Sequence, residues 1–318
     1  MLKFIATRLL LTFVTLLIIL TIVTLIPNIA PGDPARQIAG ALASEARLEA
    51  VRMSLGLNDS IPEQLVTAFT SLFTLDFGQT FNDQSVAVSD LVGAALWNST
   101  KLVALSLILV LPISIFGGVI AAYKKDSLLD RIIVNVGAAL SAIPDFVAGV
   151  FFLALLAVPF GFFKVNAAVG EDAGFFAEVQ ALLLPAFVVL TVYFGYIARV
   201  TRASTIGALE SDFARTAFMK GLSTWEVFTK HVLRNSLVPT VAVIGTQLGF
   251  LFGGLIGLEL IFNYPGLGRM IFSAVQDADY PVLRAGVLTV AVVYMVATLL
   301  SDLLIAWMNP RARLALTE

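Results

Sequence analysis

The chain has 318 residues, of which 58% are hydrophobic and only 13% are charged. Because soluble domains carry about 25% charged residues, this chain has too little polar surface to be a soluble enzyme. Its net charge of −2 says little, since a membrane protein separates its charges by side. The sequence contains no cysteine and a single histidine. These counts exclude disulfides, thiolate metal sites and cysteine nucleophiles, and they argue against an imidazole metal site or a Ser-His triad.

Six apolar segments are long enough to cross a bilayer, which takes about 20 helical residues. They are residues 9–26, 102–123, 132–163, 181–198, 236–262 and 285–307. The third is broken only by Asp145, and we interpret it as one span with an apolar extension, kinked at Pro144 and Pro159. The first could be a signal peptide, but its apolar run is longer than usual and no convincing cleavage site follows. We therefore predict an all-α integral membrane protein with six transmembrane helices.

The distribution of lysine and arginine predicts the orientation. Thirteen of the 20 basic residues lie on the side of the N-terminus, and six of those thirteen fall within residues 199–235. Arginines of the long loop after the first span carry little weight, because long loops cross the membrane regardless of charge. We expect both termini to be cytoplasmic.

Two connections are much longer than a connector needs. Residues 27–101 form an external loop with helix-like stretches at 45–55 and 61–73 and a polar segment at 76–84. Residues 199–235 form a cytoplasmic loop. The predicted organisation is a cytoplasmic N-terminus and first span (1–26), the external loop (27–101), a membrane core of five helices (102–308) and a cytoplasmic tail (309–318).

The cytoplasmic loop has the pattern of two helices separated by a glycine. Apolar residues recur at spacings of three and four before the break, which predicts one amphipathic helix with the stripe Ile206, Leu209, Phe213 and Ala217. Gly221 then interrupts, and Ser223 with Glu226 forms a capping box for a second helix. Such a basic hairpin has two interpretations that periodicity does not separate. It could lie on anionic headgroups of membrane lipid, or it could dock a cytoplasmic partner protein.

The loop sequence resembles a known family. The run Ala214-Arg215-Thr216-Ala217-Phe218-Met219-Lys220-Gly221-Leu222, followed by His231-Val232-Leu233-Arg234-Asn235-Ser236-Leu237-Val238-Pro239, is similar to the signature loop of ABC importer permeases. The similarity is greatest to the dipeptide, oligopeptide and nickel branch. The general loop of the family begins Glu-Ala-Ala, whereas this chain has Arg215-Thr216-Ala217, a variant common in peptide-type permeases.

Further matches occur in family order along nearly the whole chain. They are Ile26-Pro27 with Pro31-Gly32-Asp33-Pro34, Leu55-Gly56-Leu57, Asp76-Phe77-Gly78, Ser141-Ala142-Ile143-Pro144-Asp145-Phe146, the run from Glu259 to Arg269, Asp302 and Asn309-Pro310-Arg311. Each of these short matches is weak evidence alone, but several of them in the order of the family make the resemblance specific.

The resemblance implies the type I ABC importer permease fold and a mechanism. Two homologous permeases would pair, as a heterodimer, around a central pathway in the prokaryotic inner membrane. Two ATPase subunits would bind ATP and Mg²⁺, and an external solute-binding protein would deliver the solute. Coupling to the ATPases would involve Arg215, Thr216, Ala217, Lys220, Gly221, Leu222, Ser223, Glu226, Arg234, Asn235 and Pro239. In this scheme the small Ala217 lets its helix approach the ATPase groove, and Gly221 permits the tight break.

The chain has no Walker A sequence, so it is not expected to bind a nucleotide cofactor or to be an ATPase itself, and we expect no nucleic-acid partner. Candidate pathway or gate residues are Asp145, Gln247, Glu259, Pro265, Gly266 and Gly268. Ionisable groups in spans are functional candidates by default, but Glu259 and Asp302 lie near helix ends, which favours structural roles. For Gln247 an interhelical hydrogen bond is the commoner role. The run 265–268 is predicted to be a turn in which glycine supplies a positive φ, or part of an outer gate.

Two other function classes need consideration. An ion-coupled secondary transporter would explain six spans, but such proteins usually have inverted repeats and discontinuous helices, and neither is evident. A membrane-embedded hydrolase would need a nucleophile with a base or a metal cluster, which one loop histidine does not provide. The sequence therefore favours a permease subunit, with dipeptides, oligopeptides, nickel complexes, glutathione or oligosaccharides as possible solutes of the branch.

Overall fold

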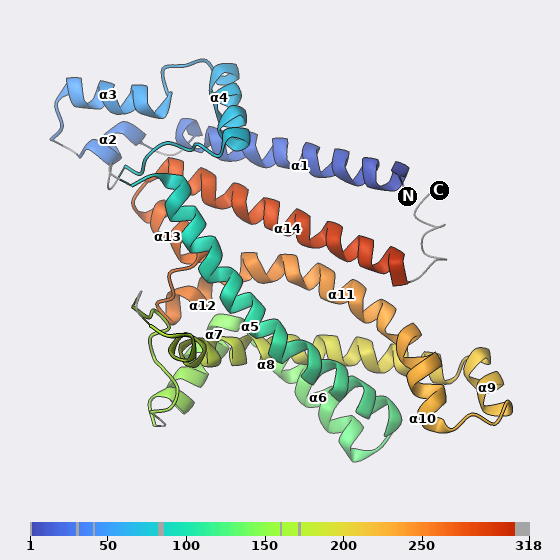
Figure 1. Ribbon diagram of the computed structural model, residues 1–318. Coiled ribbons are helices and arrows are strands. Elements are labelled where there is room, and N and C mark those ends of the chain that lie inside the picture. The colour runs from blue at the N-terminus through green and yellow to red at the C-terminus, as the bar shows by residue number, and fades with distance from the viewer. Residues whose placement is uncertain are drawn as a thin grey trace. The chain divides into compact units, whose positions relative to one another are not determined.

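The computed structural model describes residues 2–29, 32–40, 42–81, 86–159, 161–170 and 173–308. Within these ranges the chain is helical, apart from one isolated antiparallel bridge between Gln79 and Ala87. The chain divides into two compact units, which are described separately (Figure 1). Unit 1 contains residues 1–99 and 265–295, and unit 2 contains residues 100–264 and 296–318.

Each helix is labelled as in Figure 1. The helices of the first part of the chain are α1 (Leu2–Ile29), α2 (Pro34–Ala39), α3 (Glu45–Leu55), α4 (Ile61–Thr74), α5 (Val88–Tyr123), α6 (Leu128–Ser141) and α7 (Asp145–Phe152), which continues as the π-helix η1 (Leu153–Ala157). The remainder are α8 (Phe175–Leu209), α9 (Asp212–Met219), α10 (Thr224–Glu226), the π-helix η2 (Val227–Val232), α11 (Leu233–Gly254), α12 (Ile256–Ile261), α13 (Leu267–Gln276) and α14 (Tyr280–Met308).

In the described part of the chain, five helical stretches are long and apolar enough to cross a membrane, and a bent pair makes up to six. The kink predicted at Pro144 in the third span, 132–163, is confirmed, and it is a full break. The span is the pair α6 and α7–η1, bent by 102° just before Asp145. Pro144 causes this break, because it lacks an N–H and keeps the preceding residue out of the helical region. The predicted fifth span, 236–262, is also not continuous, since Leu255 separates α11 from α12.

Several helices extend beyond their apolar runs. Helix α5 begins at Val88, inside the predicted external loop, and α8 continues to Leu209, inside the predicted cytoplasmic loop. A hydropathy pattern identifies only the apolar part of a helix that crosses the hydrocarbon core. The polar turns at the ends of the same helix are therefore predicted to be loops. Ion pairs stabilise these extensions: Lys101 of α5 pairs with Glu178 of α8, and Arg202 of α8 pairs with Asp130 of α6.

Unit 1 is built around the ends of α1 and α14. The predicted helices at 45–55 and 61–73 are confirmed as α3 and α4. A buried cluster that includes Leu20 of α1, Ala68 of α4, Val88 of α5 and Leu288 of α14 forms its core. The part of the predicted polar segment that the structure describes includes the bridge at Gln79, while residues 82–85 lie outside the described ranges.

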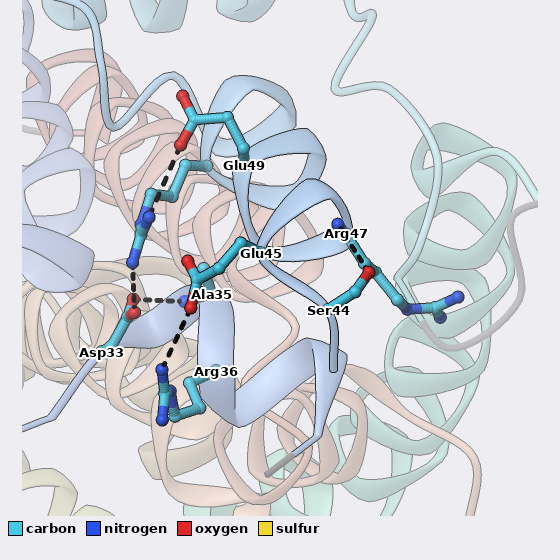
Figure 2. A network of polar contacts seen from close by, with 8 residues as sticks. Asp33, Ala35, Arg36, Ser44, Glu45, Arg47 and Glu49 are labelled. Atoms are coloured by element: carbon cyan, nitrogen blue, oxygen red, sulfur yellow. Dashed lines mark hydrogen bonds and ion pairs between the residues drawn. The ribbon is translucent and has the colours of Figure 1, made fainter. Parts of the chain in front are cut away.

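A polar network joins α2 to α3 (Figure 2). The Asp33 carboxylate caps α2 by accepting from the N–H of Ala35 at 3.0 Å, and its other oxygen accepts from Arg52 Nη2 at 2.7 Å. Arg52 also lies 3.5 Å from Glu49 Oε2. Bonding to Arg52 lowers the pKa of Asp33 and raises the pKa of Arg52. Asp33, within the family-like Pro31–Pro34 element, therefore helps to hold α2 against α3.

The core of unit 2 depends on glycines that let α5, α6 and α8 approach closely. A Cβ added to Gly195 of α8 would lie 1.9 Å from the carbonyl oxygen of Gly137 of α6. A Cβ on Gly118 of α5 would lie 2.5 Å from the carbonyl oxygen of Ala198 of α8. These helices therefore contact one another through their backbones, as small residues allow in membrane bundles.

Candidate functional site: a helical hairpin between α8 and α11

The hairpin, residues 211–232 of unit 2, begins immediately after α8 (Figure 1). Ser211 caps α9 by accepting from the N–H of Ala214 at 3.4 Å. After the turn at 220–222, the predicted capping box is confirmed: Ser223 Oγ accepts from the N–H of Glu226 at 3.3 Å, and Glu226 Oε2 accepts from the N–H of Ser223 at 3.2 Å. Local sequence therefore starts both helices of the hairpin.

Gly221 makes the turn between α9 and α10. Its φ is +80°, in the region that side chains disfavour, and its N–H donates to the carbonyl of Phe218 at 2.9 Å. A Cβ at this position would meet nothing within 4 Å. The requirement for glycine here is therefore one of backbone conformation and not of space.

The predicted single helix with the stripe Ile206, Leu209, Phe213 and Ala217 is wrong, because α8 ends at Leu209 and α9 begins at Asp212. Ser211 is the physical cause, since its side chain caps a new helix instead of continuing the old one. The hairpin is thus shorter than predicted, and its second arm continues through η2 into α11 without a loop.

The hairpin has a small core of its own. Ala214 and Ala217 of α9 pack with Val227, Phe228 and Val232 of η2, and all five are buried. The expectation that the small Ala217 faces an ATPase groove is corrected by this packing, because its side chain is 4% exposed and points into the hairpin. A small residue is needed there because α9 lies close against η2.

Three large apolar side chains of α9 are exposed. Phe213 and Phe218 are each 42% exposed, and Met219 is 75% exposed. Arg215, Thr216 and Lys220 are exposed beside them. Phe213 was predicted to belong to the apolar stripe, because a period of 3.6 assigns apolar residues to the buried face. Sequence reasoning did not single out Phe218 and Met219 as exposed residues.

The other predicted coupling residues lie in the second arm. Leu222 is half-buried against the hairpin core, and Ser223 and Glu226 form the capping box. Arg234, Asn235 and Pro239 are exposed and lie in α11, whereas Arg234 and Asn235 were predicted to lie in the loop before the fifth span. The Asn235 side chain donates to the carbonyl of His231 at 2.7 Å, next to η2. A π-helix at this junction is notable because π-segments frequently mark functional sites.

Two ion pairs connect the turn after α5 to the end of α8, next to the hairpin. Lys125 Nζ lies 2.9 Å from Glu210 Oε1, and this bond raises the pKa of Lys125. Arg202 forms two hydrogen bonds with the buried Asp130. The end of α8 from which the hairpin emerges is therefore held to α6 and to the turn that precedes it.

The predicted pathway residues fall into different parts of the chain. Asp145, Gln247 and Glu259 belong to unit 2, whereas Pro265, Gly266 and Gly268 belong to unit 1. Asp145 is half-buried at the start of α7, where Oδ1 accepts from the N–H of Phe146 at 2.7 Å. Gln247 is half-buried in α11.

Glu259 is fully buried, on α12, and its carbonyl accepts from the N–H of Tyr264 at 2.7 Å. This complete burial differs from the water-accessible helix end that the sequence suggested, and the structural role of Glu259 stays a prediction. Asp302, which was grouped with it, is half-buried in α14.

The prediction of a positive φ within 265–268 is wrong. Gly266 has φ −99° and caps α13, Gly268 lies inside α13, and the positive φ occurs earlier, at Asn263 (+53°). Pro265 and Leu267 are instead fixed by α5: Asn98 Nδ2 donates to the carbonyl of Pro265 at 2.9 Å, and the N–H of Leu267 donates to Ser99 Oγ at 2.8 Å. These two polar residues of α5 were not recognised from the sequence as partners of this segment.

Comparisons with known proteins decide the family. Residues 114–314 match the binding-protein-dependent transport system inner membrane component family, and residues 1–115 match the N-terminal component of the same system. The chain belongs to this family of transport permeases. It is a multi-pass membrane protein, and it serves as the permease subunit of an ABC importer that works with an ATPase and a solute-binding protein. Permeases of this family are not enzymes, and ATP hydrolysis is carried out by the partner ATPases.

Named relatives align over nearly their full length. A probable peptide ABC transporter permease protein, y4tP, of Sinorhizobium fredii is 31% identical over 98% of this chain and 99% of its own length. The glutathione transport system permease protein GsiC of Escherichia coli strain K12 is 33% identical, and that of Pectobacterium atrosepticum is 34% identical, with the same coverage. Family membership favours the permease over both the secondary transporter and the membrane-embedded hydrolase.

Proposed function

We propose that this permease forms half of the translocation pathway of an importer for short peptides, glutathione-like peptides included, paired with a second, homologous permease. The names of its relatives support this solute class, since they include a peptide permease and glutathione permeases that align along the entire chain. The ATPases, two per transporter in this proposal, would bind the ATP and Mg²⁺.

In this proposal both termini and the hairpin 211–232 lie in the cytoplasm of a prokaryotic cell, and residues 27–101 face outwards. The excess of basic residues on the terminal side of the chain supports this orientation. The absence of cysteine provides a clean test. Leu42→Cys should react with a membrane-impermeant maleimide added outside intact cells, and Met219→Cys should react only after the membrane is opened. The reverse pattern would overturn the orientation.

We further propose that the hairpin docks an ATPase subunit through the exposed surface of α9, called the docking face, to which Phe213, Phe218 and Met219 contribute large apolar side chains. The observation that carries this is the combination of a packed hairpin core with large apolar side chains left in the open. A hairpin whose core is already filled has no internal use for these side chains, and exposed apolar side chains mark interaction surfaces. Arg215 and Lys220 flank them with positive charge that suits acidic side chains of a partner.

The test is co-purification of the ATPase subunits in mild detergent. Met219→Asp should release them, because it puts a charge at the most exposed apolar position of the face, whereas Leu42→Asp, on the external segment, should retain them. If Met219→Asp retains the ATPases but the chain no longer binds vesicles containing anionic lipid, the hairpin is a lipid-binding element and not the docking site. Uptake of a labelled tripeptide by the reconstituted transporter, with a nickel chelate as the comparison, tests the solute class.

A further inference from the structure

Unit 1 contains a polar cavity that the proposed function does not use. It has a volume of about 180 Å³ and is enclosed by α1, α3, α4, the turn between α3 and α4, and the start of α14. Its wall includes Thr24, Asp59, Gln64, Tyr280 and Arg284, all of which belong to unit 1. A water molecule occupies about 30 Å³ in the liquid, so the cavity has room for a small polar molecule or a headgroup and not only for one water.

Two polar groups of this wall have no partner. Among the residues that the structure describes, the Nε of Arg284 and the Oγ of Thr24 are buried without a hydrogen bond, and Thr24 is only 7% exposed. Arginine keeps its charge in proteins, and a buried charge without a counter-ion is strongly unfavourable. Arg284 is half-buried, and its unbonded Nε beside a cavity therefore points to an anion that the cavity accepts.

Two other polar side chains of the wall, Gln64 and Tyr280, are already hydrogen-bonded. Gln64 accepts from Asn28 Nδ2 at 2.8 Å and donates to the carbonyl of Asp59 at 3.1 Å. The hydroxyl of Tyr280 lies 3.4 Å from Gln37 Oε1. Gln64 thus joins the end of α1 to the turn before α4 and holds the cavity in shape, while Arg284 and Thr24 remain available.

Asp59 restricts which anion fits. Asp59 lines the same cavity, and its negative charge disfavours a second negative charge and attracts a positive one. A zwitterion carries charges that suit both Arg284 and Asp59. Thr24 lies near the end of α1 and Arg284 near the start of α14, which places the cavity where two membrane-spanning helices end, within reach of lipid headgroups and of water.

We propose that this cavity binds a small zwitterion whose carboxylate or phosphate pairs with Arg284 and Thr24 and whose ammonium group faces Asp59. Two sources share this chemistry: a soluble amino acid or peptide, and the headgroup of a phospholipid such as phosphatidylethanolamine. The inference follows from unit 1 alone and does not depend on the solute that the transporter carries.

The test measures ligand-induced thermal stabilisation of the full chain, purified with any retained partners, in nanodiscs of phosphatidylglycerol, which lacks an ammonium group. One arm adds phosphatidylethanolamine to the lipid, and the other adds glycylglycine to the buffer. We expect one arm to raise the Tm of the wild type by several degrees. Arg284→Gln and the nearly isosteric Thr24→Val should lose this rise, and Asp59→Asn should lose the preference for the zwitterion over phosphatidylglycerol.

Arg47→Gln, which makes the same substitution at an exposed position of α3, is the matched control and should keep the full rise. If Arg284→Gln does not fold, Arg284→Lys preserves the charge and should retain a reduced rise. The proposal is overturned if neither arm stabilises the wild type, or if Arg284→Gln and Thr24→Val are stabilised as much as the wild type. Because no ATPase activity or transport is measured, this outcome is independent of the proposed transport function.

Discussion

Arg202 of α8 forms two parallel hydrogen bonds with Asp130 of α6, from Nε to Oδ1 at 2.5 Å and from Nη2 to Oδ2 at 2.6 Å. The Asp130 side chain is 4% exposed, and its Oδ2 also accepts from the N–H of Asp126 at 2.8 Å. One carboxylate therefore joins the turn before α6 to the helix from which the hairpin emerges. Planar, two-point pairing of this kind requires a guanidinium, which lysine does not replace.

We expect Asp130→Asn to destabilise unit 2 by about 3 kcal/mol, because it leaves the Arg202 charge without its partner in a largely buried place. Arg202→Lys should cost part of this, since one of the two hydrogen bonds is lost. Thermal unfolding of the purified chain measures both effects. Lys125→Gln, which removes only the exposed pair with Glu210, should change the Tm little. Equal losses for Asp130→Asn and Lys125→Gln would show that the buried pair has no special importance.

A second prediction concerns the contact between Gly195 and Gly137. Gly195→Ala should separate α6 from α8, because the new Cβ would lie 1.9 Å from a backbone oxygen that has no free rotation. Overpacking against backbone costs at least 1–3 kcal/mol, and we expect a large drop in folded yield. Gly207→Ala, in the same helix with nothing within 4 Å of the new Cβ, should be neutral or stabilising. Fluorescence-detected size exclusion compares the two, and equal yields would contradict the packing argument.

Sequence reasoning located most elements but not their ends. Helix α3 occupies the predicted residues 45–55 because Ser44 and Gly56 are strong start and stop signals. In contrast, α5 and α8 extend past their apolar runs because ion pairs such as Lys101–Glu178 make polar helical turns favourable. Those pairs join residues far apart in the sequence, so no local pattern reveals them.

The hairpin shows the same limit. Its capping box and the break at Gly221 were predicted, because both are encoded within a few residues of sequence. The buried face of α9 was predicted only in part, since the expected stripe contained both the buried Ala217 and the exposed Phe213, and the position of η2 decides between them. The break at Leu255 was missed although two glycines precede it, because the apolar run continues through the break.

A third prediction concerns pH and the Asp33–Arg52 pair. The bond with Arg52 lowers the pKa of Asp33, so Asp33 contributes stability above its unfolded pKa of about 3.9 and loses it as the pH falls through its folded pKa. Asp33→Asn keeps the cap on Ala35 but removes the charge pair. We expect the wild type to melt above the variant at pH 7 and the difference to shrink below about pH 4.

The pH series needs a control from the same network. Arg36→Gln removes the longer, more exposed Arg36–Glu45 pair at 3.8 Å and should leave the Tm close to that of the wild type at pH 7. A difference between wild type and Asp33→Asn that stays constant from pH 7 to pH 3 would mean that the charge of Asp33 is not what stabilises α2 and α3.

The last prediction separates two effects at Gly221. Its φ of +80° makes any side chain unfavourable, but asparagine and aspartate tolerate this region better than alanine, and a Cβ would meet nothing within 4 Å. We therefore expect Gly221→Asn to couple ATP hydrolysis to transport nearly normally. Gly221→Asp should reach the membrane but fail to couple, because it puts a negative charge between Lys220 and the proposed docking face. ATPase activity and solute uptake in proteoliposomes measure the coupling.

Two outcomes would contradict this prediction. If Gly221→Asn and Gly221→Asp fail equally, the backbone conformation controls coupling instead of the charge. Normal transport by Gly221→Asp would contradict the assignment of the hairpin as the ATPase contact.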